Sequence, residues 1–176
     1  MQASIRDRRI EQEWRLLVEL AERNPDSVER PETVEIEGGP AFQVTFHGVE
    51  AITDLDGGDA RRASHVVVFQ FPRFYPGTPI EAYLNEPAFH PNIDPKTGFV
   101  CLWTKSNIGD TVLEALRRLR LVLSWRTYNL DADHIMQPKA AEHAREGAIP
   151  ELELADLKGL PERQPRGEPG RRVRLS

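Results

Sequence analysis

The sequence predicts a single α+β domain. An N-terminal helix leads into a four-stranded antiparallel meander and a cysteine loop, and C-terminal helices pack on one side of the sheet. Two segments carry apolar residues at helical spacing, and several short segments alternate apolar with polar residues. The connections between the short segments are too brief for parallel crossovers, which favours the meander. With 176 residues, the chain is long enough to bury a core without disulfides or metals.

The first helix is expected over residues 4–23. Ser4 and Asp7 have the spacing of a capping box, and Asn24-Pro25 ends the helix. Its apolar residues share one stripe of a 3.6-residue period: Ile10, Trp14, Leu17 and Ala21. Four arginines lie largely off this stripe, and they form either a solvated face or a docking surface for a partner: Arg6, Arg8, Arg9 and Arg15.

Four strands are expected next, at 34–37, 42–47, 65–71 and 80–84. The second alternates apolar and polar residues, as a half-buried strand does, and the third is dense in β-branched residues. The loop over residues 71–79 is too rich in proline for regular structure, and its Tyr75-Pro76 bond is a candidate cis peptide. We expect six residues in the core: Phe42, Phe46, Val66, Val68, Leu116 and Leu119.

A second helix is expected over residues 111–125, with Thr111 and Glu114 as its capping box. A short helix follows over 138–145, with a proline at its start and Gly147 after its end. From residue 148 the periodic pattern dissolves. The predicted organisation is therefore one domain over residues 1–147 and a flexible tail over 148–176.

Composition narrows the function classes. The net charge of −5 gives no general reason to expect nucleic-acid binding, and no apolar stretch is long enough to span a bilayer. The N-terminal residues lack the apolar centre of a signal peptide. One unpaired cysteine suits the reducing cytoplasm, which is the expected location.

Cys101, the only cysteine, cannot form a disulfide within the chain or a zinc site of the usual Cys-rich kind. It is therefore a core residue, a spare surface thiol or a nucleophile. It stands eleven positions after His90, in a run that combines a rigid His-Pro-Asn turn, a glycine able to reverse the backbone, and apolar residues beside the thiol.

Three motifs, two of them within this run, give the chain a family resemblance. They are Phe71-Pro72 with Tyr75-Pro76 and Pro79, then His90-Pro91-Asn92-Ile93, then Gly98-Phe99-Val100-Cys101-Leu102. In this order and spacing, the chain resembles the ubiquitin-conjugating enzymes, which carry a ubiquitin-like protein as a thioester. The resemblance covers roughly residues 4–145. It implies the same fold that the periodicity predicts.

The resemblance implies an activity for Cys101. The thiol accepts the C-terminus of a ubiquitin-like protein from an activating enzyme and passes it to a lysine amine of a target protein. A thiolate is both a nucleophile and a leaving group, so a cysteine suits this double exchange. The carrier needs no cofactor, because its partner uses the ATP. Since the incoming group is already a thioester, we expect no histidine base and an ordinary thiol pKa for Cys101.

Other residues receive roles through the same resemblance. Asn92 supplies a carboxamide, either for the tetrahedral oxyanion or to brace the cysteine loop. His90 supports the turn. Asp131, Asp133 and His134, in the loop after the second helix, either assist the acceptor amine or are ordinary solvated polar residues. The N-terminal helix, with Arg6, Arg8 and Arg9, is the expected docking surface for the activating enzyme.

The chain also departs from the family. The interval from Asn92 to Cys101 is one residue longer than in most members, and the C-terminal helices are reduced. These differences indicate a divergent, bacterial member, of the kind encoded in operons linked to antiphage defence. Two alternatives stay open. One is a catalytically silent binding module, and the other is a cysteine hydrolase with His47, His90 or His134 as its base.

Overall fold

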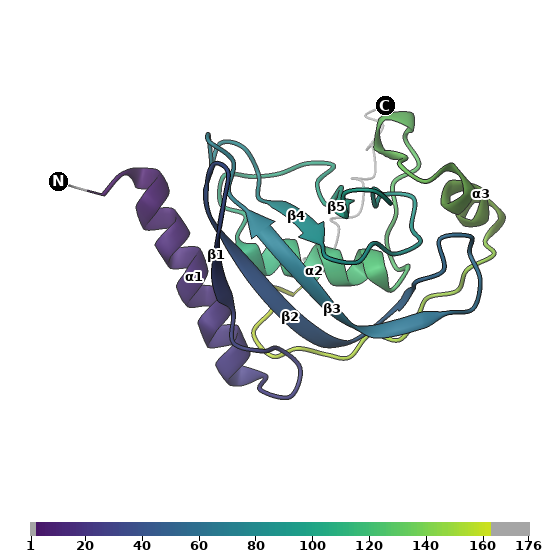
Figure 1. The fold of residues 1–176 in the computed structure, drawn as a ribbon, viewed down its shortest axis with the longest axis horizontal. Helices are drawn as coiled ribbons and strands as arrows, with labels where there is room; N and C mark the ends of the chain where they lie inside the picture. The colour runs from purple at the N-terminus through teal and green to yellow at the C-terminus, as the bar shows by residue number, and fades with distance from the viewer. Residues whose placement is uncertain (1–2, 163–176) are drawn as a thin grey trace, which may run out of the picture.

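The computed structural model describes residues 3–162 and has the α+β architecture predicted from the sequence (Figure 1). Helix α2 lies across one face of an antiparallel sheet, with α1 beside β1 and α3 near the connection between β2 and β3. In chain order the elements are α1 (Ile5–Arg23), β1 (Glu32–Ile36), β2 (Gly39–Ile52), β3 (Arg61–Gln70), β4 (Glu81–Leu84), β5 (Phe99–Val100), α2 (Val112–Leu123), the 3-10 helix η1 (Ala132–His134) and α3 (Pro138–Glu146).

The sheet has five strands in the order β1-β2-β3-β4-β5, where the sequence predicted four. The additional strand, β5, has only two residues and pairs Phe99 with Tyr83 and Val100 with Ala82. A strand of two residues carries no readable alternation, so periodicity misses it. Its importance is positional, because Cys101 is the next residue.

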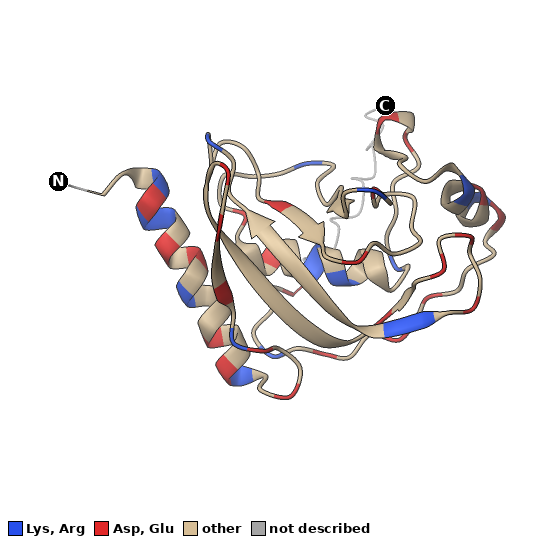
Figure 2. Cartoon of the chain, in the orientation of Figure 1, with Lys and Arg blue, Asp and Glu red and all other residues tan. Residues whose placement is uncertain are grey.

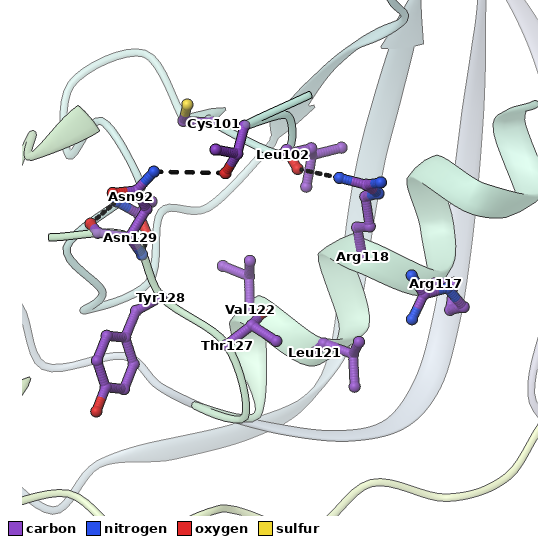
Figure 3. A pocket seen from close by; sticks show the side chains of 11 residues that line it. Asn92, Cys101, Leu102, Arg117, Arg118, Leu121, Val122, Thr127, Tyr128 and Asn129 are labelled. Atoms are coloured by element: carbon purple, nitrogen blue, oxygen red, sulfur yellow. Dashed lines mark hydrogen bonds between the residues drawn. The ribbon is translucent and has the colours of Figure 1, made fainter. Parts of the chain in front are cut away.

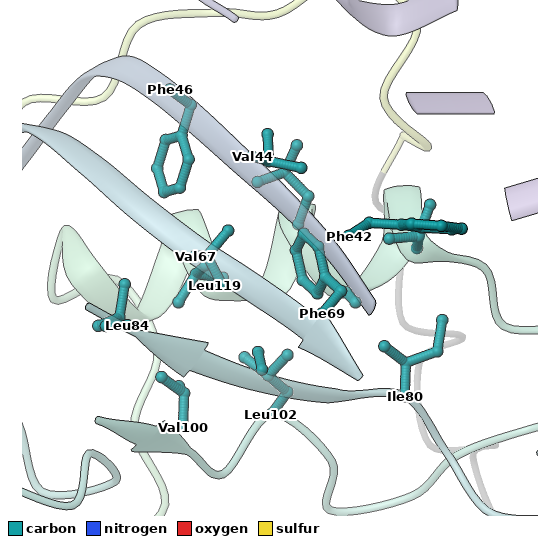
Figure 4. Packing of buried hydrophobic residues seen from close by; sticks show 14 of the residues in the cluster. Phe42, Val44, Phe46, Val67, Phe69, Ile80, Leu84, Val100, Leu102 and Leu119 are labelled. Atoms are coloured by element: carbon teal, nitrogen blue, oxygen red, sulfur yellow. The ribbon is translucent and has the colours of Figure 1, made fainter. Parts of the chain in front are cut away.

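The predicted core is correct for Phe42, Phe46 and α2, but it is wrong on β3. Val66 and Val68 are only half-buried on the opposite face, whereas Val67 and Phe69 are fully buried against α2 (Figure 4). Side chains alternate across a strand, so a run of four apolar residues leaves the buried face undecided. The pairing of β3 with β2 and β4 decides it.

The start of α2 is capped by a residue from another helix. The predicted capping box does not form, since Thr111 makes no side-chain cap bond and Glu114 pairs with the arginines of its own helix. Instead, the fully buried carboxylate of Glu13 on α1 accepts the main-chain N–H of Val112 at 2.8 Å. A carboxylate at a helix N-terminus satisfies a free N–H and complements the helix dipole.

Two further donors complete the shell of Glu13. The Tyr75 hydroxyl donates to Oε1 at 2.7 Å, and the Arg9 Nε donates to the same oxygen at 2.8 Å. Glu13 falls on the buried stripe of α1, three residues after Ile10, where an apolar residue would be expected. One carboxylate therefore joins α1, the proline-rich loop and α2.

Residues 148–160 differ from the predicted flexible tail. This segment runs back along the molecule and pairs with the far end of β2, through bonds such as Glu50 N–H to Glu153 O and Ala155 N–H to Gly48 O. Leu152 is buried, and the buried Arg120 of α2 donates to the Ala155 carbonyl. Main-chain bonds to a sheet edge leave no periodic signal in the sequence. The rest of the predicted tail, residues 163–176, lies outside the described residues.

Charges of both signs are interspersed along α1, and Arg61 and Arg62 form a basic band at the start of β3 (Figure 2). Within residues 3–162, no helix combines the length and apolarity that a bilayer crossing requires.

Replacing Glu13 with alanine should lower the free energy of unfolding by about 3–5 kcal/mol, because it leaves Arg9 and the Val112 N–H without their buried partner. Urea denaturation measures the loss. Glu11→Ala is the matched control, since Glu11 pairs with Arg15 on the exposed face of the same helix and such a pair contributes under about 1 kcal/mol. Equal losses in the two variants would contradict the capping role of Glu13.

Candidate active site around Cys101

Main-chain hydrogen bonds fix the position of Cys101. The residue follows β5, and its N–H donates to the Asn92 carbonyl at 2.9 Å. Gly98 reverses the chain just before β5 with a φ of +74°, and a Cβ there would lie 2.0 Å from the Leu84 carbonyl oxygen. Only glycine fits this approach. The cysteine is thus held between the His-Pro-Asn turn and the edge of the sheet.

The Asn92 side chain braces the loop that faces Cys101. Its Nδ2 donates to the main-chain carbonyls of Asn129 at 2.7 Å and His134 at 2.9 Å, and its Oδ1 accepts the Asn129 N–H at 2.7 Å. The residue is only 2 % exposed. Both hydrogens of the carboxamide are therefore engaged, and neither is free for an oxyanion. Of the two roles expected for Asn92, the geometry fits the brace.

His90 lies buried behind this brace. Its Nδ1 accepts the Asn92 N–H at 3.1 Å, so the proton is on Nε2, which donates to the Thr127 carbonyl at 3.1 Å. Burial lowers the pKa of His90 to about 3, because the charged ring would lose its hydration. A neutral ring with both nitrogens bonded fits the supporting role expected for it and leaves no nitrogen free to serve as a base.

A second carboxamide reinforces the same loop. The Nε2 of the buried Gln137 donates to the carbonyls of Ala88 at 2.8 Å and Ile93 at 2.9 Å, and the Met136 N–H donates to the Pro91 carbonyl at 2.8 Å. Gln137 is not predictable as a site residue, because a glutamine before a proline carries no signal beyond the start of a helix. Together with Asn92, it ties residues 88–93 to residues 129–137.

This loop places an imidazole beside the thiol. The Nδ1 of His134 lies 3.0 Å from the Cys101 sulfur. A histidine this close to the thiol differs from the expectation that Cys101 has no histidine base. Burial raises the pKa of the half-buried Cys101 thiol, and the main-chain N–H of Trp103 offsets part of that rise. The expected ordinary thiol pKa is therefore wrong. Asp131 and Asp133 lie on the same turn but face solvent.

A cavity of about 340 Å³ opens next to Cys101. Cys101, Asn92 and Asn129 lie at one end of it, and Arg117 and Arg118 of α2 lie at the other (Figure 3). Arg118 donates to the Leu102 carbonyl at 3.3 Å and stacks over the Trp103 ring at 4.6 Å, which holds α2 against the cysteine loop. Both arginines also pair with Glu114. The remaining lining residues are Leu102, Thr104, Leu121, Val122, Thr127 and Tyr128.

The structure brings together three of the six predicted site residues, Cys101, Asn92 and His134, and places His90 behind them. Asp131 and Asp133, beside His134 in the chain, are exposed to solvent. Among residues 3–162, no three His, Cys, Asp or Glu side chains converge on a point that would hold a metal ion.

Comparisons with known proteins find similarity among solved structures but not among family models or curated sequences. No protein-family model matches the chain, and no curated protein matches its sequence. Among solved structures, the human ubiquitin-conjugating enzyme E2 G1 is similar to this chain, with a TM-score of 0.48 and 20 % sequence identity. The match covers 69 % of this chain and 98 % of that one.

Acidification should destabilise the fold through two buried histidines. Burial lowers the pKa of His65 to about 4 and that of His90 to about 3, against an ordinary value of 6.5. Below that ordinary value the unfolded chain takes up protons that the folded chain refuses, so stability present above pH 6.5 is lost as the pH falls toward 4 and 3. At pH 5 each histidine should cost about 2 kcal/mol.

Urea denaturation at pH 7 and pH 5 measures this loss. His65→Gln, which keeps a donor for the Val49 carbonyl now bonded to His65 Nε2, should roughly halve the difference between the two pH values. An unchanged difference would mean that His65 is not held neutral in the fold.

Asn92→Ala should free the loop at residues 127–137. The variant removes three hydrogen bonds and leaves two part-buried carbonyls unpaired, so it should cost about 3 kcal/mol of stability and speed amide exchange at Asn129. Asn24→Ala is the matched control, because Asn24 makes the same pattern of bonds to Leu20 and Lys158 at the end of α1. Hydrogen exchange at the Asn129 amide should stay slow in this control. Fast exchange in both variants would argue against a local brace.

Proposed function

We propose that this protein is a carrier enzyme of the ubiquitin-conjugating type. Cys101 accepts the C-terminus of a ubiquitin-like protein as a thioester from an activating enzyme, and it passes that acyl group to an amine of a target protein. The observation that carries the proposal is the setting of Cys101. Cys101 is half-buried and lines one end of a cavity, on a loop that is fixed independently by β5, Asn92 and Gln137.

The proposed chemistry has two exchanges at one carbonyl carbon. In the first, the Cys101 sulfur bonds to the acyl carbon and the thiolate of the activating enzyme leaves. In the second, an amine nitrogen bonds to that carbon and the Cys101 sulfur leaves, which forms an amide. A rigid loop supports both steps, because each needs the sulfur aligned with a second reactant. The ATP is consumed by the activating enzyme, so the carrier itself needs no cofactor.

The cavity suits the tail of the modifier. An extended C-terminal peptide bonded to the sulfur has room beside α2, where apolar side chains such as Val122 and the Arg118 guanidinium line the wall. The cavity alone would suit a carrier and a binding module equally, whereas the presence of Cys101 favours the carrier, and its reactivity separates the two.

The proposed docking surface for the activating enzyme is the beginning of α1 with the two loops beside it. Arg6 donates to the Phe71 carbonyl, and Arg9 donates to the Gly109 carbonyl, so both arginines hold those loops against α1. Arg8 is exposed. Three large apolar side chains on these segments are also exposed: Ile5 at 72 %, Phe74 at 72 % and Ile108 at 69 %. Apolar residues grouped with a free cation are typical of a protein-binding surface.

The wider context is part of the same proposal. A bacterial conjugation pathway would supply the activating enzyme, the modifier and the target in the cytoplasm, and its role would be antiphage defence. A gene beside this one that encodes a small modifier with a processed glycine terminus would support this context. An unrelated gene neighbourhood would count against it.

Incubation with the activating enzyme, its ubiquitin-like protein and ATP should produce an adduct on Cys101 that a thiol reductant cleaves. Cys101→Ser should give an adduct that resists the reductant, since the product is an ester, and Cys101→Ala should give none. Gel electrophoresis with and without reductant distinguishes these outcomes.

A charged activating enzyme that leaves the wild-type chain unmodified would refute the carrier. If Cys101→Ser also retained full biological activity, the silent binding module would be the correct assignment.

A further inference from the structure

We infer that His134 is the proton acceptor of Cys101, and that the same imidazole nitrogen receives the proton of the attacking amine in the second step. The first half of this inference concerns the thiol alone, and the second half rests on the proposed function. It changes the expected role of His134, from one of three polar residues near an acceptor lysine to the base of the cysteine itself.

The thiol needs a base because its surroundings keep it protonated. Cys101 is half-buried, and burial raises the pKa of its thiol, so at neutral pH almost none of it is thiolate. The N–H of Trp103 stabilises the thiolate only in part. The reactive species is the thiolate, so the proton must leave as the sulfur attacks. His134 Nδ1, 3.0 Å from the sulfur, is placed to take it.

The position of His134 is set by its main chain. Its carbonyl accepts a hydrogen bond from the Asn92 carboxamide at 2.9 Å, and its N–H donates to the Asp131 carbonyl at 2.9 Å. These main-chain bonds therefore place the His134 ring beside the sulfur, and the ring's own hydrogen bonds are not needed for this position. It also follows that replacing the imidazole leaves the brace intact, so variants at this position should fold.

The neighbouring titratable groups do not compete for this role. His90 is neutral, buried and bonded through both nitrogens. Asp131 and Asp133 belong to the same turn and face solvent. Arg118, across the cavity, is a permanent cation and cannot accept a proton.

In the first step the proton of Cys101 moves to His134 Nδ1 as the sulfur bonds to the acyl carbon of the donor thioester. The carbon–sulfur bond of the donor then breaks, and the departing thiolate takes the proton from the imidazolium. The imidazole is neutral again, and Nδ1 has lost the S–H that occupied it.

In the second step that vacated nitrogen serves the amine. The amine nitrogen bonds to the carbon that is attached to the Cys101 sulfur, so its proton arises close to Nδ1. As the carbon–sulfur bond breaks, the imidazolium returns this proton to the sulfur. An amide, a free thiol and a neutral imidazole result, and the cycle is closed.

Alkylation by iodoacetamide tests the pair without any partner protein. His134→Gln should react at least tenfold more slowly than the wild type at pH 7, and the two rates should converge at high pH, where the thiol ionises unaided. The thiolate absorbance at 240 nm should titrate differently in the two proteins. His143→Gln is the matched control, since His143 packs on the Phe89 ring, and it should react as the wild type does.

Chemical rescue separates a base from a structural residue. In His134→Ala, added imidazole should restore part of the alkylation rate, whereas a structural defect would not respond. Equal rates for His134→Gln and the wild type from pH 6 to pH 9, with no response to imidazole, would overturn the inference.

The second half of the inference is tested on the charged carrier. Thioester already formed on His134→Gln should discharge to free lysine at least tenfold more slowly than that on the wild type, and undiminished discharge would overturn this half. A wild-type chain that shows the histidine effect on alkylation but is never charged would refute the carrier and leave the Cys101–His134 pair standing.

Discussion

The carboxamide of Asn92 is the contact on which the site depends. This side-chain amide bonds to two carbonyls and one N–H of the loop at residues 129–134. The main-chain carbonyl of Asn92 accepts the N–H of Cys101. One buried residue thus sets the distance between the segment that carries the thiol and the segment that carries the imidazole. An amide suits this position, because it offers donors and an acceptor without a charge that burial would penalise.

Burial favours the protonated Cys101 thiol, which suits the reversible exchange proposed for it. A sulfur that must leave as easily as it attacks gains nothing from a strongly stabilised thiolate, since a low thiol pKa weakens the nucleophile. A resting thiol is also less open to oxidation than a thiolate. The half-buried setting of Cys101 therefore fits a residue that is reactive only when a base and an acyl donor are both present.

Sequence alone predicted the helices and most of the strands, because those features follow from periodicity, and it placed the single cysteine on a loop beside the His-Pro-Asn turn. The sequence was insufficient where adjacent residues are all apolar, or where two residues in contact are far apart along the chain. Four adjacent apolar residues on β3 hid the buried face, and Phe99–Val100 was too short to show as a strand. The closeness of Cys101 and His134 is set by a brace between segments 37 and 42 residues apart, which no local pattern encodes.

Glu13 has a consequence of a different kind. It accepts hydrogen bonds from Arg9 on its own helix, from Tyr75 in the proline-rich loop and from Val112 at the start of α2. Rotating or shifting α1 would move the first turn of α2 as well, because the buried Glu13 carboxylate cannot exchange its bond to Val112 for a bond to water. The two helices are therefore coupled, and a displacement of α1 would also displace the wall of the cavity that α2 forms.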